Sequence, residues 1–242
     1  MAGDRGKGRI RQFFAGARIT RGALYLLFME VGFSLVYLMS ELKVRADIVS
    51  WLVATPDTVW REGKVWTLVT SGVLEIDFVS LIFHGFILWM FVPVLEKWWG
   101  TKRFLFFVLW MTLIATTVGT LVGYWLGQHG PVSGLAGLDP FIFGSVVAYG
   151  ILYGSQPVSF FGVLPMSGRQ LMYGFIAFAS LLVLLGQKWS TGAGWGSAMF
   201  LAWLLASGKW SPKLWMLKRK QKKLRKHLRV VKDDDDPKKW LN

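Results

Sequence analysis

Residues 104–127 read FLFFVLWMTLIATTVGTLVGYWLG, an apolar run without a charged side chain. A helix must cover about 20 apolar residues to cross the hydrocarbon core of a bilayer, so this run is long enough to span a membrane. Five further stretches span it or nearly span it: 22–42, 73–95, 135–155, 170–187 and 191–208. The sequence therefore predicts an all-α membrane protein with six transmembrane helices.

The composition supports one membrane domain. Of the 242 residues, 53% are hydrophobic and 16% aromatic, and this balance is typical of membrane proteins rather than soluble domains. We expect a six-helix domain over 22–208 between a basic segment, 1–21, and a basic tail, 209–242. The absence of cysteine excludes disulfides, thiol nucleophiles and thiolate metal sites.

The net charge of +14 points to topology rather than to nucleic acid, because most of the 28 Lys and Arg residues lie before Gly22 or after Gly208. Cytoplasmic flanks of membrane helices collect basic residues. An even number of spans with both termini in the cytoplasm fits this pattern. We expect a multi-pass protein of the inner (plasma) membrane whose main partner is the lipid bilayer, and no nucleic acid partner.

Two segments outside the spans are predicted to lie at the membrane surface. The loop over 43–72 carries Trp51, Trp60 and Trp66, whose indole rings favour the headgroup layer. The stretch 214–231 places leucines on one helical face among Lys and Arg, as in a cytoplasmic amphipathic helix that binds anionic lipid headgroups. Docking of this basic stretch to RNA or a ribosome is the alternative.

Small residues predict one specific helix contact. Small side chains let membrane helices approach closely. We expect the fourth and sixth apolar stretches to pack together through two stripes of such residues: Gly144 and Ala148 on the fourth, and Gly194, Ala198, Ala202 and Ala206 on the sixth.

The order of residues from Trp66 through Leu95, Glu96 and Gly100 to Arg103 resembles the second-helix region of rhomboid intramembrane proteases. The phrase Gly137-Leu-Asp-Pro-Phe-Ile-Phe-Gly144 resembles the family phrase in which Gly-X-Ser-Gly precedes Ile-Phe-Gly. The resemblance covers about 60–208, including a loop over 156–169 like the one between rhomboid helices four and five. It implies a rhomboid-like six-helix bundle.

The same resemblance places each family site residue on a different side chain here. The nucleophilic serine falls on Asp139, and the general base histidine falls nearest Gly194. The histidine of the oxyanion hole falls on Ser80 and its asparagine partner on His84, while Glu75 replaces another frequent histidine. The match is strong in architecture and weak at every catalytic position.

These substitutions remove the chemistry of a serine protease. Such an enzyme needs a hydroxyl next to a base, and donors aimed at the developing oxyanion. A carboxylate at Asp139 is a poor acyl acceptor and repels an oxyanion, and Pro140 removes a backbone N–H. The favoured interpretation is a pseudoprotease that binds or organises transmembrane segments of client proteins, with no catalytic residue; enzymatic activity stays open.

Three other functions are compatible with the sequence. In the first, Ser133 is a displaced nucleophile with His129 or His84 as base. In the second, Asp139 and Asp77 act as an aspartic pair. In the third, Glu30, Asp139 and His84 line the path of a transporter or channel.

Asp139 also has a structural explanation, because Asp followed by Pro is a common helix start. A pairing of Asp139 with His84 is a further hypothesis, since an ionisable group in a membrane needs a partner. Glu30 needs a cavity or partner for the same reason. A metal or proton site formed by Glu75, Asp77, His84 and Asp139 matches no ligand motif, so we expect no metal and no cofactor.

Overall fold

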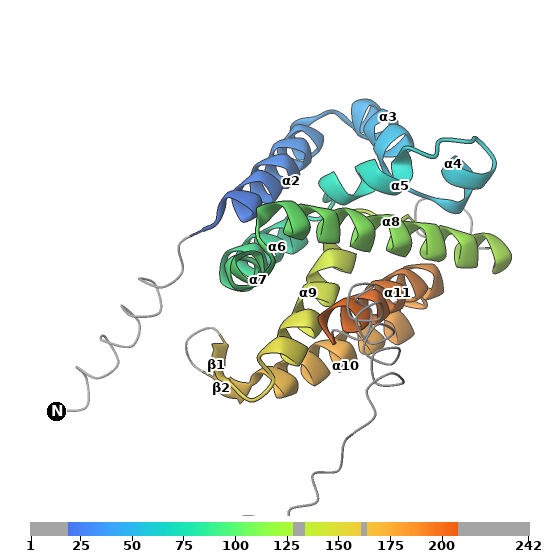
Figure 1. Cartoon of the computed structure of the whole chain (residues 1–242). Helices are drawn as coiled ribbons and strands as arrows, with labels where there is room; N and C mark the ends of the chain where they lie inside the picture. Colours follow the sequence, from blue (N-terminus) through green and yellow to red (C-terminus); the bar gives the residue numbers. More distant parts are fainter. Residues whose placement is uncertain (1–18, 128–133, 161–163, 208–242) are drawn as a thin grey trace, which may run out of the picture. The chain divides into compact units, whose positions relative to one another are not determined.

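The computed structural model describes residues 19–127, 134–160 and 164–207. Most of this part of the chain is helical, with one two-stranded hairpin (Figure 1). The elements in chain order are α2 (Arg21–Met39), α3 (Leu42–Leu52), α4 (Pro56–Trp60), α5 (Thr67–Thr70), η1 (Ser71–Val73), α6 (Phe78–Met90), α7 (Val92–Trp99), α8 (Thr101–Trp125), α9 (Asp139–Leu152), β1 (Pro157–Phe160), β2 (Leu164–Ser167), α10 (Gly168–Gly186) and α11 (Trp189–Ala206).

Each predicted apolar stretch contains helix, but not every one is a full span. Within the described residues, α2, α8 and α10 are long and apolar enough to cross a membrane. A fourth span arises if α5 with η1 and α6 count together, although the two parts meet at a bend of 84°. The helix α9 is apolar but short. The chain is thus a helical membrane protein with three to four candidate spans in the described part.

The stretch 73–95, expected as one helix, is divided in two places. The Asp77 carboxylate accepts a hydrogen bond from the Ser80 N–H at 2.8 Å and starts α6 afresh after the bend. A second break follows at Phe91, and Pro93 stands in the first turn of α7. Both breaks have local causes, because a capping carboxylate and a proline each favour a helix start.

The segment over 43–72 is not a loop but holds three short α-helices and the start of η1. Thr55 and Thr58 form a capping box at the start of α4. The rings of Trp51 and Trp66 stack with centroids 5.7 Å apart, and the Trp66 indole N–H donates to the Trp51 carbonyl at 3.1 Å. Both tryptophans are exposed, and their position at the membrane surface stays a prediction.

The contact between the fourth and sixth apolar stretches is confirmed. Gly144 of α9 faces α11 so closely that a Cβ there would lie 3.5 Å from both the Ala198 carbonyl and the Ala202 methyl group. Ala148 and both of these alanines are fully buried. In Figure 1 the first turn of α9 lies next to α8, and α10 and α11 lie alongside the rest of α9. Small side chains therefore permit close packing at this interface.

Glu96, near the end of α7, binds the start of α2. Its carboxylate accepts hydrogen bonds from the backbone N–H groups of Gly22 at 2.9 Å and Ala23 at 3.1 Å, and from the hydroxyls of Thr101 at 2.7 Å and Thr20. The first N–H groups of a helix lack partners within the helix. Glu96 supplies these partners from another helix and so fixes where α2 begins.

Several predicted features lie outside the described residues. They are the basic segment before 19, His129, Ser133 and the amphipathic helix expected over 214–231.

Candidate functional site

His84 lies at the centre of a polar cluster formed with the buried Glu30 and Glu75 and the partly exposed Asp139. Its Nδ1 atom is 2.6 Å from Oε1 of Glu30 and 3.7 Å from Oε2 of Glu75. Its Nε2 atom is 2.9 Å from Oδ1 of Asp139. The imidazole is fully buried, and the expected pairing of His84 with Asp139 is present.

Three helices and a bend bring these side chains together. Glu30 is in the middle of α2, and Ser34, one turn later, accepts a hydrogen bond from the Glu75 N–H at 2.8 Å. Glu75 lies in the bend before α6, where its Oε1 accepts from the N–H groups of Ile76 at 2.9 Å and Asp77 at 3.0 Å. The other oxygen, Oε2, is thereby directed toward His84.

Gly137 completes the wall of the cluster. Its φ is +77°, a conformation that favours glycine. A Cβ at this position would collide with Oε2 of Glu75 and lie 3.2 Å from Cε1 of His84. Its N–H donates to the Ser71 carbonyl at 2.9 Å, which ties this turn to η1, just before the bend.

The two hydrogen bonds of His84 limit its protonation. A neutral imidazole has one N–H donor, whereas an imidazolium has two. Satisfying both Glu30 and Asp139 requires either an imidazolium or a proton on one of the carboxyl groups. In either case the cluster carries one proton more than a neutral imidazole between two carboxylates.

Asp139 does not cap α9 in the way expected. The N-cap is Leu138, Asp139 is the first helical residue, and no capping hydrogen bond from a side chain is formed. Its carboxylate is directed to His84 instead, while Pro140 stands in the first turn as predicted. The carboxylate still gains from the positive end of the helix dipole.

The structure brings together four of the five positions that the rhomboid resemblance singles out. Glu75, Ser80, His84 and Asp139 line one cavity of about 760 Å³, whose other walls include α10, α11 and residues 134–136. Gly194 does not line it. A Cβ on Gly194 would lie 2.8 Å from the Ala115 carbonyl and 2.6 Å from the Leu135 side chain, so this residue packs against α8.

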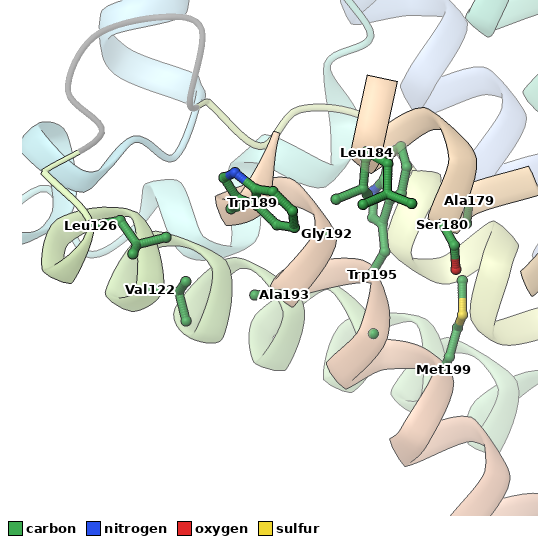
Figure 2. Close-up of a pocket in the computed structure, with 12 residues that line it drawn as sticks. Val122, Leu126, Ala179, Ser180, Leu184, Trp189, Gly192, Ala193, Trp195 and Met199 are labelled. Atoms are coloured by element: carbon green, nitrogen blue, oxygen red, sulfur yellow. The ribbon is translucent and has the colours of Figure 1, made fainter. Parts of the chain in front are cut away.

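A second cavity, of about 680 Å³, lies beside the first. It is lined by mostly apolar side chains of α8, α10 and α11, with Ser180 among them, and Figure 2 shows Trp189 and Trp195 projecting into this region. Val183 and Trp195 line both cavities. These two side chains therefore separate an apolar cavity from the one that reaches His84.

One acid that was predicted to belong to the cluster lies outside it. Asp77, grouped with the acids as a possible ligand, is instead the exposed cap of α6. Glu30, which was predicted to need a cavity or a partner, makes the shortest contact to His84. The signal was present, because an ionisable residue inside an apolar stretch calls for a partner at a similar depth in the membrane.

Comparison with known proteins identifies the family. The model of the family described as eukaryotic integral membrane protein (DUF1751) matches residues 23–206. A search of curated proteins finds no match to the chain. The matched range runs from the start of α2 to the end of α11 and includes the whole cluster around His84. The chain belongs to this family of eukaryotic integral membrane proteins.

Proposed function

We propose that this protein is a rhomboid-like membrane protein without protease activity, which binds transmembrane segments of client proteins. The observation that carries the proposal is the cavity with a polar floor and apolar walls. His84 and Asp139 form the floor, whereas Phe178, Leu182 and Leu185 of α10 belong to the walls. Such a cavity suits a membrane helix that carries a polar group.

The proposed topology has six membrane segments with both termini in the cytoplasm. In this topology α9 and α11 also cross the membrane, surrounded by the longer helices, because close packing at Gly144 buries their backbones within protein. The basic tail then lies at the cytoplasmic face, where it binds anionic lipid headgroups.

A client helix enters from the bilayer between α6 and α10. Val79 and Phe83 of α6 form one side of the cavity and Phe178 and Leu182 of α10 the other. Val79 and Phe178 are also exposed, so apolar surface continues from the cavity toward lipid. A polar group on the client then reaches Asp139, whose side chain is 32% exposed.

The side chains in the cavity bind rather than cleave. Asp139 is already hydrogen-bonded to His84 within the cluster, and a negative charge on its carboxylate opposes the oxyanion of an acyl transfer. Gly194 offers no base, because glycine has no side chain, and the position packs against α8. A client hydroxyl or amide, by contrast, donates readily to a carboxylate.

Photo-crosslinking tests this proposal. A photoreactive amino acid replaces Leu182 at the cavity, or Leu35 on α2 as the control; the two leucines are 39% and 42% exposed. The probe is a single-span reporter with a serine in its membrane helix, compared with an all-leucine version. We expect the photoreactive residue at 182 to crosslink the serine reporter more than the all-leucine reporter, and we expect no cleavage of either. Equal crosslinking at both positions would contradict the proposal, as would cleavage that is lost in Ser133→Ala.

A further inference from the structure

We infer that Glu30, Glu75 and His84 form a binding site for a first-row divalent transition metal such as Zn²⁺. The three residues each offer one ligand atom, and these atoms lie within 4.8 Å of one another. Two carboxylate oxygens and one imidazole nitrogen are a known donor set for such ions. The site goes beyond client binding and does not depend on it.

The spacing of the donors is close to that needed for coordination. Ligand atoms about 2.1 Å from a tetrahedral metal lie roughly 3.4 Å apart. The Nδ1 atom of His84 is 3.7 Å from Oε2 of Glu75 and 2.6 Å from Oε1 of Glu30. If the Glu30 oxygen moves slightly away from Nδ1 and the Glu75 oxygen moves slightly closer to it, all three atoms reach the spacing of metal ligands.

Glu30 carries an oxygen that the protein leaves unused. Its side chain is 1% exposed, and its Oε2 atom has no hydrogen-bond partner among the described residues. An unpaired carboxylate oxygen buried in a membrane protein is costly. A metal ion bound between Glu30 and its neighbours would satisfy it.

Asp139 occupies the position of an orienting group. Histidine ligands commonly donate their second N–H to a carboxylate, which fixes the tautomer and the ring. The Nε2 atom of His84 meets Oδ1 of Asp139 at 2.9 Å, so Nδ1 is the nitrogen left for a metal. Glu75 is likewise fixed by the two backbone N–H groups that bind its Oε1.

Charge favours the ion as well. One imidazolium does not balance the two buried glutamates together with Asp139, whereas a dication with a neutral imidazole cancels the charge of Glu30 and Glu75. Like charges in a poorly solvated site repel strongly. The cavity lined by Glu75, His84 and Asp139 supplies the access route for the ion.

Metal analysis of the purified full-length chain tests the site. After chelation, reloading with Zn²⁺ and desalting, mass spectrometry of the metal should find about one Zn²⁺ per chain in the wild type. We expect Glu30→Gln, Glu75→Gln and His84→Asn to lose it. Asp77→Asn is the matched control, because Asp77 lines the same cavity but caps α6, and it should retain the ion.

Affinity and stability provide independent measurements. Competition with a coloured chelator should show binding about 10 to 100 times weaker in Asp139→Asn, as expected for a group that orients a ligand. In the wild type, Zn²⁺ should raise the melting temperature and Mg²⁺ should not, which gives a result even if a ligand variant fails to fold. A wild type that retains no Zn²⁺, or a His84→Asn variant that retains as much, overturns the inference.

Discussion

His84 and Asp139, 55 residues apart in the sequence, meet at 2.9 Å through Nε2 and Oδ1. The contact joins the middle of α6 to the first residue of α9. It also places a carboxylate where the rhomboid resemblance expects a nucleophilic hydroxyl. The stability of the protein should therefore depend on the polar character of residue 84.

We expect His84→Leu to destabilise the protein much more than His84→Gln. Leucine leaves three carboxylates around a side chain that offers no donor, and loss of one partner of a buried ion pair costs about 3–5 kcal/mol. Glutamine retains an N–H₂ donor and loses less. Thermal unfolding in detergent with a chelator present measures the difference, and equal melting temperatures would count against the pairing.

Gly137→Ala should destabilise more than Gly63→Ala. Both glycines have positive φ, so each substitution carries a backbone cost of about 1–2 kcal/mol. Only at Gly137 does the new methyl group collide with Glu75, whereas nothing lies within 4 Å at Gly63. The excess, about 1–3 kcal/mol, is the expected cost of overpacking. Denaturation of the two variants side by side gives it directly, and equal losses would show that the turn at Gly137 tolerates displacement of Glu75.

Glu96 should make stability depend on pH. Burial raises its pKa, but hydrogen bonds from Thr20, Thr101, Gly22 and Ala23 outweigh this and hold the pKa of Glu96 below its usual value of 4.5. A lowered pKa in the folded state contributes stability above the unfolded pKa, and this stability is lost as the pH falls through the folded value.

Glu96→Gln should accordingly cost about 1.5–3 kcal/mol at neutral pH, because hydrogen bonds to a charged group are replaced by neutral ones. The difference from wild type should shrink as the pH falls below 4.5. Unfolding measured over a pH series checks both expectations. A difference that stays constant down to the lowest pH would mean that the Glu96 charge does not support α2.

Gly144→Leu should disrupt the packing of α9 on α11. A side chain there meets Met111, Ala198 and Ala202, and overpacking of this kind costs about 1–3 kcal/mol. Gly174→Leu on α10 is the control, since nothing lies within 4 Å of that position. Both changes alter helix propensity equally, so the difference in unfolding free energy reports packing alone. Similar values for the two would contradict the close contact.

The helices were predictable because apolar length and small-residue stripes are local features of the sequence. The packing of Gly144 against Ala198 followed from the same pattern. The bend before α6 was missed, because apolar residues flank it on both sides. Glu75 breaks the helix there by binding two N–H groups of its own bend, and hydropathy does not register such bonds.

The cluster was only partly predictable, because its members come from elements far apart in the sequence. The resemblance brought His84 and Asp139 together. It gave no partner for Glu30, whose contact with His84 spans 54 residues and depends on how α2 packs on α6. The exclusion of Asp77 depends on which way its side chain turns at the start of α6.

The packing of Gly194 against Ala115 and Leu135 also bears on evolution. Serine at 139 and histidine at 194 would restore the identities of a catalytic pair, yet an imidazole at 194 would have to displace part of α8 or the Leu135 side chain. Selection acting on single substitutions would meet this loss of stability before any gain in catalysis. Because α11 fits so closely against α8 at Gly194, we expect no protease to evolve from this sequence through single substitutions.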